Sequence, residues 1–391
     1  MEGNNVSFQF FSPTKIHFGN GYRKKIGIVS KKYGKKCLIV RTKKKLSERE
    51  VFFNDIISQL EHQGIKYVIY DKVISNPSTE VVERGVSIAE EKEVDFIIGY
   101  GGGSALDTAK SISLLIENKK KSWELLFKSL SNPFSDGNPL IQSLPLIAIT
   151  TTSGTGSHIT QASVISDLNN NEKNTLFHST LFPNECIVDP ELMNTVPSHV
   201  TSATGFDALC HAFESFLNPN ASRLTRTLSL QSMNIIVQTL PKLIRDINNQ
   251  EYRELMAYAD TLSGICLSNA GAEAPHPIGE IINGYIPELS HGETLAFVYP
   301  SYCKYIIDII PERFEHILNV FEFYIPKDTN LSKNDQAFYM MKNFLIDIDL
   351  LISSSSIKLD EQLIYNVTNK LTFNLPLTNA EGLKEVFKNS I

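Results

Sequence analysis

The chain has 391 residues, of which 42% are hydrophobic and 20% charged, so it is long enough for two or three globular domains. The formal net charge of -6 argues against nucleic-acid or anionic-membrane binding as the main role. The chain opens without a signal-peptide pattern, and its five cysteines are scattered with no C-x-x-C pair. No apolar run reaches the length that spans a bilayer. We therefore expect a cytoplasmic protein with reduced thiols.

The first half of the chain alternates short apolar runs with helical patterns. Residues 8–19 read as strands around a Ser-Pro turn, and further strands are expected at 35–42, 65–71, 94–104 and from 144 onward, with helices at 47–63, 79–92 and 105–117. Two shorter strands near 164–167 and 187–190 look like a pair. Helical periods dominate after about residue 195. The pattern predicts an α/β domain with a parallel, Rossmann-like sheet over residues 1–194 and an all-α domain over 195–391.

Two loops in the α/β part are suited to phosphate binding. The glycine run Gly101–Gly103, followed by Ser104, stands where a strand ends and a helix begins. Consecutive glycines allow close backbone approach, and a helix N-terminus offers free N–H groups and a positive dipole end. A second Thr/Ser/Gly-rich loop, 150–157, also follows a strand. Neither loop is a G-x-G-x-x-G fingerprint, but two such loops in one sheet predict nucleotide binding.

The residues after the strand at 35–42 bear on which dinucleotide is bound. An acid at this place would bind the ribose 2′-hydroxyl and repel a 2′-phosphate. The sequence instead reads Arg41-Thr42-Lys43-Lys44-Lys45. This favours NADP(H) over NAD(H), although lysines after a strand also serve solubility.

Four residues in the helical half have the types and spacing of a metal site. Asp207 and His211 are four apart, so on a helix both project from one face, and His276 and His291 follow in a Gly/Pro-punctuated segment. One carboxylate and three imidazoles suit Fe²⁺ or Zn²⁺. Each residue also has a structural alternative: Asp207 as a helix-capping acid, His211 as a buried core histidine and His291 as a polar turn residue.

Five motifs together resemble one family, the iron-containing (group III) alcohol dehydrogenases of the dehydroquinate synthase-like superfamily. The motifs are GGGSALDTAK (101–110), TTSGTGS (151–157), FPNECIVDPEL (182–192), GFDALCHAFE (205–214) and HGETLAFVYP (291–300). They stand in the family's order and cover nearly the whole chain.

The resemblance implies a dinucleotide-binding domain, a helical metal domain and an active site in the cleft between them. Hydride would pass between a nicotinamide and a small alcohol/aldehyde pair polarised by Fe²⁺ or Zn²⁺, which would be held by Asp207, His211, His276 and His291. A homodimer or larger homo-oligomer is also implied. The residues that match cofactor positions are Thr42, Asn76, Gly102, Gly103, Ser104, Asp107, Thr151, Thr152, Thr155 and Lys173.

The chain departs from the family's pattern in its third metal block. Many members read H-x-x-x-H there, the first histidine binding metal and the second lying near the nicotinamide. If His276 is the ligand, Glu280 takes the second position and becomes a candidate catalytic group; if His276 is the second histidine, Ala272 replaces a ligand. The step of fifteen residues from His276 to His291 is close to the usual separation of these two ligands in the family, which favours the first alignment. His158 also stands where the family usually has Glu.

Two other functions remain open from the sequence. One is a metal- and NAD-dependent lyase of the dehydroquinate synthase type, which would need more cationic residues near the ligand blocks than the chain has between 201 and 293. The other is a catalytically degenerate dinucleotide-binding protein, suggested by Glu280 and His158.

Overall fold

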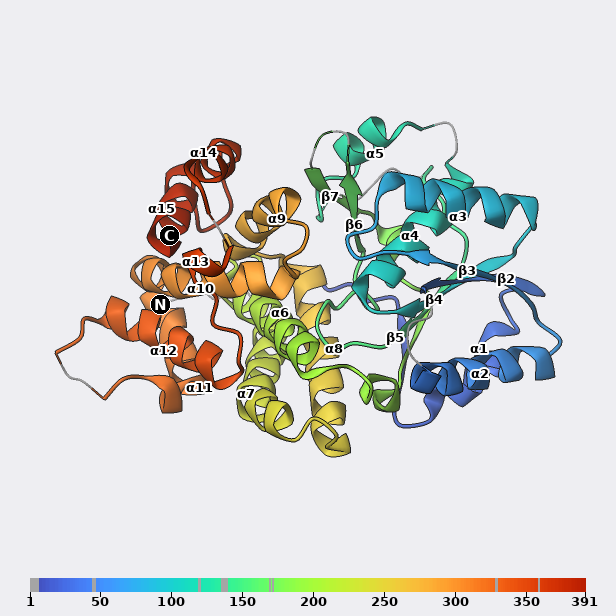
Figure 1. Ribbon diagram of the computed structural model, residues 1–391, viewed down its shortest axis with the longest axis horizontal. Coiled ribbons are helices and arrows are strands. Elements are labelled where there is room, and N and C mark those ends of the chain that lie inside the picture. Colours follow the sequence, from blue (N-terminus) through green and yellow to red (C-terminus); the bar gives the residue numbers. More distant parts are fainter. Residues whose placement is uncertain are drawn as a thin grey trace. The chain divides into compact units, whose positions relative to one another are not determined.

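The structure is a computed structural model, and it describes residues 7–43, 47–118, 121–134, 140–168, 170, 172–327, 330–357 and 359–391. The chain divides into two compact units (Figure 1). The sheet unit comprises Ser12–Pro197 and Asn248–Ala257, and the helical unit comprises Ser198–Ile247 and Tyr258–Ile391 with the described residues before Ser12.

The sheet unit is built on a six-stranded parallel sheet with the order β1-β8-β5-β4-β2-β3. Its strands are β1 (Lys15–Phe18), β2 (Lys36–Thr42), β3 (Lys66–Val73), β4 (Phe96–Gly101), β5 (Leu146–Thr150) and β8 (Glu185–Val188). All residues of β4, β5 and β8 are buried, because helices cover both faces of a parallel sheet. The chain moves one way in the sheet from β2 to β3 and the other way from β4 to β5, which defines a topological switch point.

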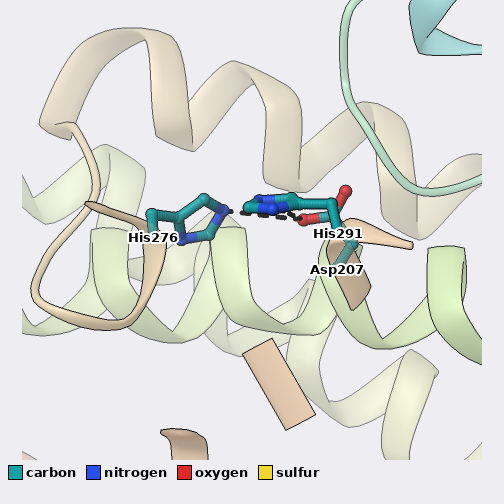
Figure 2. A group of neighbouring side chains, drawn as sticks. All are labelled: Asp207, His276 and His291. Carbon is teal, nitrogen blue, oxygen red and sulfur yellow. Dashed lines mark ion pairs between the residues drawn. The ribbon is translucent and has the colours of Figure 1, made fainter. Parts of the chain in front are cut away.

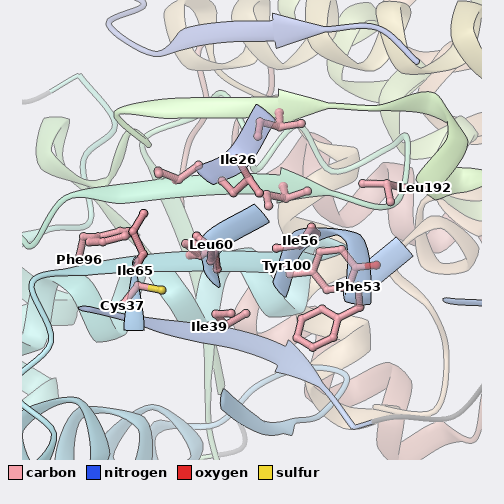
Figure 3. Close-up of a cluster of buried hydrophobic side chains, with 14 residues drawn as sticks. Ile26, Cys37, Ile39, Phe53, Ile56, Leu60, Ile65, Phe96, Tyr100 and Leu192 are labelled. Atoms are coloured by element: carbon pink, nitrogen blue, oxygen red, sulfur yellow. The ribbon is translucent and has the colours of Figure 1, made fainter. Parts of the chain in front are cut away.

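Helices cover the two faces of this sheet. One face packs on α1 (Ile26–Ser30) and α2 (Ser47–His62) through a core that includes Phe53, Phe96 and Tyr100 (Figure 3). The other face packs on α3 (Thr79–Glu91) and α4 (Gly103–Glu117). The remaining elements of the sheet unit are η1 (Tyr22–Lys25), α5 (Trp123–Ser129), β6 (Ala162–Asp167), β7 (Glu172–Phe177), η2 (Ser179–Leu181) and η3 (Pro190–Met193). The predicted α/β fold with a parallel sheet is confirmed.

Two details of the strand prediction are wrong. Residues 8–11 form no strand, and Phe8 and Phe11 are 50% and 56% exposed, so the aromatic run there was misleading. The short strand near 164–167 does not pair with the one near 187–190. β6 pairs antiparallel with β7, whereas β8 joins the main sheet between β1 and β5. Strand partners depend on tertiary contacts that a local pattern does not contain.

The helical unit contains only helices among its described elements. They are α6 (Ser198–Leu217), α7 (Arg223–Arg245), α8 (Gln250–Ala270, whose first residues belong to the sheet unit), α9 (Pro275–Tyr285), α10 (His291–Ile309), α11 (Pro311–Val320), η4 (Glu322–Tyr324), α12 (Lys333–Asp347), α13 (Ser354–Ile357), α14 (Glu361–Lys370) and α15 (Ala380–Ser390). α6 is buried from Gly205 to Leu217, which makes it the central helix of this unit. Of the helices described, none is long and apolar enough to cross a membrane.

Candidate functional site

Three helices of the helical unit bring four predicted site residues together. Asp207 and His211 come from α6, His276 from the first turn of α9, and His291 from the first residue of α10. The Nε2 atoms of His211 and His276 both lie 3.5 Å from Oδ1 of Asp207, and Nε2 of His291 lies 3.9 Å from the same oxygen. The rings of His211 and His276 stack with centroids 4.7 Å apart. Figure 2 shows the side chains of Asp207, His276 and His291 directed toward one another.

Local sequence explains how each helix presents its ligand atom. On α6 the four-residue spacing puts Asp207 and His211 on one face, one turn apart. α9 begins at Pro275, whose restricted φ angle suits the first helical position. This defines where the helix starts and places His276 in its first turn. α10 begins with a capping box, in which Ser290 and Glu293 satisfy each other's backbone N–H groups immediately around His291.

Gly292 allows α10 to approach α6 closely. A Cβ atom at this position would lie 2.1 Å from the carbonyl oxygen of Ala203, which stands one turn before Asp207 on α6. No side chain fits at that distance, so only glycine permits this backbone contact. The contact fixes how near His291 comes to Asp207.

The electrostatics of the cluster favour positive charge. Burial alone would raise the pKa of Asp207, but His211 and the other two imidazoles lower it to about 2. Burial alone would lower the pKa of His276, but Glu214 and Asp207 raise it to about 10. In the absence of a cation these carboxylates therefore hold a proton on His276, and a metal ion binding at Nε2 would take that proton's place.

The donor set fits a divalent cation. The side chains of Asp207, His276 and His291 each offer one ligand atom within 4.8 Å of the others. His211 lies outside this mutual group, although its Nε2 is 3.5 Å from Oδ1 of Asp207. Ligand atoms about 2.1 Å from a tetrahedral ion are about 3.4 Å apart, close to the 3.5–3.9 Å that separate the imidazole Nε2 atoms from Oδ1 of Asp207. Oδ1 of Asp207 and Nε2 of His276 are buried and make no hydrogen bond in the described part of the chain. Buried polar atoms are normally satisfied, so these two require another partner. Fe²⁺ and Zn²⁺ both accept this mixture of nitrogen and oxygen.

Two glutamates lie on the helices that carry the cluster. Glu280 lies on α9 one turn after His276, half-buried, outside the group of ligand atoms described above. Glu214, which was not predicted as a site residue, is completely buried and accepts a hydrogen bond of 2.7 Å from Nδ1 of His276. Its spacing of seven from Asp207 places it on the same face of α6, which is the signal that would have pointed to it.

The predicted cofactor residues lie mainly at one edge of the sheet unit. Thr42 ends β2, Gly102 follows β4 and Thr151 follows β5, and these three strands are neighbours in the order β2-β4-β5. Asn76 follows β3, the next strand outward, with the positive φ of 50° that asparagine tolerates. The carboxyl edge beside a switch point is where parallel sheets bind their ligands.

The two loops at this edge pack directly on each other. A Cβ atom on Gly102 would lie 2.9 Å from Oγ1 of Thr152, and one on Gly103 would lie 2.8 Å from Cγ2 of Thr155. Gly102 caps α4 without a side-chain bond, and the amides of Gly103 and Ser104 have no hydrogen-bond partner among the described residues. The first turn of α4 therefore retains the free N–H groups that suit an anion.

Asp107 lies inside the unit, below these loops. Its carboxylate accepts hydrogen bonds from Oγ of Ser157 at 2.6 Å and from the backbone N–H of Val164 at 3.1 Å. Burial raises its pKa, and nearby Lys110 opposes this. Its contacts tie α4 to the second loop and to β6.

His158 and Lys110 are also buried in this region. Lys110 donates to the carbonyl oxygens of Thr160 at 2.9 Å and Ala162 at 2.7 Å, and burial lowers its pKa to about 8. Burial and the charge of Lys110 lower the pKa of His158 to about 3, so this imidazole is neutral. With 1% of its surface exposed, His158 acts within the fold that supports the loop.

Of the residues that favoured NADP(H), Arg41 is held by internal contacts, whereas Thr42 and Lys43 are exposed. Arg41 is 8% exposed, forms an ion pair with Glu50 and stacks 4.0 Å from the ring centroid of Phe53, so internal contacts occupy its guanidinium. Residues 41–45 contain no acid, but folding brings Glu50 of α2 to Arg41. Thr42 and Lys43 are exposed, and Lys44 and Lys45 lie outside the described residues. Lys173 lies on β7, half-buried.

A parallel sheet with free helix N–H groups at its switch point, in one chain with a largely buried cluster of one carboxylate and three imidazoles, is typical of metal-dependent, dinucleotide-linked enzymes. The family model described as "Iron-containing alcohol dehydrogenase" matches residues 13–190, and "Fe-containing alcohol dehydrogenase family, C-terminal" matches residues 201–350. The chain belongs to the iron-containing alcohol dehydrogenase family.

Individual relatives agree with this assignment. The chain is 32% identical over 308 residues to the NAD-dependent methanol dehydrogenase of Bacillus methanolicus, covering 79% of this chain and 78% of the relative. It is 27% identical over 318 residues to the 1,3-propanediol dehydrogenase of Klebsiella pneumoniae, covering 81% and 80%. A crystal structure of an archaeal halo-thermophilic Red Sea brine pool alcohol dehydrogenase matches with a TM-score of 0.88 at 28% identity, over 99% of both chains. The alcohol dehydrogenase from Oenococcus oeni matches with a TM-score of 0.85 at 26% identity, over 98% of this chain and 100% of that one. The predicted alcohol dehydrogenase function is confirmed at this level, and the lyase alternative is not favoured.

Proposed function

We propose that the chain catalyses the reversible oxidation of a small alcohol to its aldehyde, with a nicotinamide dinucleotide and one Fe²⁺ or Zn²⁺ ion. The observation that carries the proposal is the convergence of three imidazole Nε2 atoms within 3.9 Å of a single buried Asp207 oxygen. The helical unit would hold the cation through Asp207, His211, His276 and His291. The sheet unit would hold the dinucleotide at the carboxyl edge of β2, β4 and β5.

Each group has a defined chemical task in this proposal. A divalent cation held by these residues would supply the Lewis acidity that polarises the substrate oxygen, and the nicotinamide would supply the hydride chemistry. The low exposure of Asp207 and His276 keeps water from the cluster and strengthens its electrostatic interactions. Oxidation of an alcohol releases one hydride and one proton. Glu280, on the face of α9 that carries His276, is our candidate to accept the proton.

On the dinucleotide side, the free amides of Gly103 and Ser104 would bind the pyrophosphate at the positive end of α4. Thr151, Thr152 and Thr155 would supply hydroxyls from the second loop, which Asp107 holds in place through Ser157. Asn76, after β3, and Lys173, on β7, are our other candidate contacts. The methanol relative is described as NAD-dependent. Thr42, which carries no charge, would repel neither NAD(H) nor NADP(H), so we expect both to bind.

The first experiment is an anaerobic titration of metal-free protein with Fe²⁺ and, separately, with Zn²⁺. Oxidation of NADH and NADPH is followed in the presence of a panel of short aldehydes. We expect oxidation to rise with metal and saturate at one equivalent per chain. Failure to bind either metal would refute the proposed site and favour the degenerate dinucleotide-binding protein. Tight binding of metal and dinucleotide without turnover of any aldehyde in the panel would mean that the substrate belongs to another class.

The expected homodimer or larger assembly is tested on the same samples by light scattering, which measures the molar mass of the particle in solution.

The Gly103→Val variant tests the dinucleotide loop. The new side chain must displace Thr155, because a Cβ atom alone would lie 2.8 Å from its methyl group. Overpacking of this size costs about 1–3 kcal/mol, so we expect NADH affinity to fall roughly tenfold or more in a fluorescence titration. Gly85→Ala is the matched control, because its Cβ would overlap Ile112 in the core of the same unit. Equal losses of NADH affinity in both variants would show that the effect is not specific to the loop.

A further inference from the structure

Glu214 is the buried group next to the metal cluster that the proposed reaction leaves without a task. It lies on α6 with no exposed surface. Its Oε1 atom accepts a hydrogen bond from Nδ1 of His276 at 2.7 Å and a longer one, 3.3 Å, from the hydroxyl of Tyr299. Its Oε2 atom accepts from the backbone N–H of Glu273 at 2.7 Å. Both carboxylate oxygens are therefore engaged by groups of fixed direction.

The bond to Nδ1 determines which nitrogen of His276 is available to a cation. A metal-binding imidazole is neutral and carries one N–H, on either Nδ1 or Nε2. A carboxylate accepts hydrogen bonds and cannot donate them, so Glu214 requires the proton on Nδ1. The lone pair is then on Nε2, the atom that lies 3.5 Å from Oδ1 of Asp207 and has no hydrogen bond among the described residues.

The second bond of Glu214 fixes the main chain that carries His276. Glu273 stands two residues before the start of α9, and its amide points at Oε2 of Glu214. The same carboxylate therefore sets both the path of the chain into α9 and the rotation of the His276 ring. Glu214 and Asp207 lie on the same helix, α6. The helix therefore fixes the distance between Glu214, which orients His276, and Asp207, which would bind the cation.

We propose that Glu214 is a positioning residue that holds His276 as the Nδ1–H tautomer and so directs its Nε2 atom to the cation. The inference rests on the proposed metal site. Carboxylates that bond the distal nitrogen of a metal-binding histidine raise its basicity and orient its ring, and their loss typically weakens metal binding by about 10–100-fold.

Glu214→Gln separates this role from a purely structural one. A glutamine of the same shape has one acceptor oxygen and one NH₂ donor group. If its oxygen accepts from Glu273, its NH₂ group faces Nδ1 of His276 and favours the proton on Nε2, the wrong tautomer. If its oxygen faces His276, the NH₂ group opposes the amide of Glu273. Glutamine can therefore satisfy only one of the two partners.

The test measures Zn²⁺ affinity by competition with a chromophoric chelator, using the full chain of wild type and variant. We expect Glu214→Gln to bind Zn²⁺ about 10–100-fold more weakly. Glu185→Gln is the matched control, because Glu185 is a buried carboxylate bonded to His17 in the sheet unit. We expect Glu185→Gln to retain wild-type Zn²⁺ affinity. Wild-type affinity in a folded Glu214→Gln protein would overturn the inference.

A second measurement does not depend on how the variant folds. Wild-type protein labelled with ¹⁵N-histidine is loaded with Zn²⁺, and the His276 signals are assigned by their loss in His276→Ala. We expect Nδ1 to be protonated and Nε2 to carry no proton. A proton on Nε2 would overturn the inference. Wild-type protein that binds no Zn²⁺ would refute the proposed metal site itself, an outcome distinct from wild-type affinity in Glu214→Gln.

Discussion

Asp207→Asn is expected to release the metal ion and to lower turnover at least about a thousandfold, because a metal's stabilisation of developing charge is worth several kcal/mol. Asp207 supplies the carboxylate oxygen on which the Nε2 atoms of the three histidines converge. Asparagine keeps the shape of the side chain and removes its negative charge. A divalent cation would then face four neutral ligands in a buried site, which does not compensate for its lost hydration.

The measurement is metal content per chain after dialysis, together with kcat and a thermal denaturation curve. Asp308→Asn is the matched control: Asp308 is exposed on α10, the helix that begins with His291, and is bonded to Asn334. We expect the control to keep one metal ion per chain and wild-type turnover. Metal-free wild-type protein serves as the reference for thermal stability, because Asp207→Asn is expected to lack the metal ion and so to have a similar melting temperature. Retention of one tightly held metal ion by Asp207→Asn would contradict the assignment of this residue.

Gly292→Ala is expected to reduce turnover roughly a hundredfold without touching any ligand atom. The added Cβ would lie 2.1 Å from the carbonyl oxygen of Ala203, and a main-chain oxygen cannot move aside as a flexible side chain does. The first turn of α10 must therefore move away from α6, and it carries His291 with it. Displacement of a catalytic group by about 1 Å can lower the rate by about this factor. We also expect a loss of stability of about 1–3 kcal/mol.

Gly382→Ala separates the loss of stability from the effect on the site. A Cβ at Gly382 on α15 would lie 2.1 Å from the hydroxyl of Tyr305 in the same unit, an overlap that the tyrosine side chain can relieve in part by moving. We expect Gly382→Ala to lower the midpoint of chemical denaturation and leave Zn²⁺ affinity unchanged. Gly292→Ala should lower both. Wild-type Zn²⁺ affinity in Gly292→Ala would mean that the position of α10 does not control the cluster.

The sequence was sufficient where a periodic pattern corresponds directly to a local structure. Buried apolar runs such as the one at 35–42 predicted the parallel strands, because strands covered on both faces are apolar throughout. The spacing of Asp207 and His211 predicted one helix face because the helical repeat fixes it. The glycine run at 101–103 was predicted to stand between a strand and a helix, and β4 ends at Gly101 and α4 begins at Gly103.

Relations between distant segments required the tertiary structure. The sequence left His276 and Ala272 as alternatives, and the fold places Nε2 of His276 beside Asp207. The strand order, the pairing of Arg41 with Glu50 and the bond from His276 to Glu214 join segments between 9 and more than 150 residues apart. The contact of Gly292 with Ala203 likewise joins distant segments, since the two positions are 89 residues apart. Residue types and short spacings therefore determined which chemistry the chain can perform, whereas packing of the helices and strands decided which atoms meet. Contacts of this kind follow from the packing of side chains over the whole fold, which no local repeat encodes.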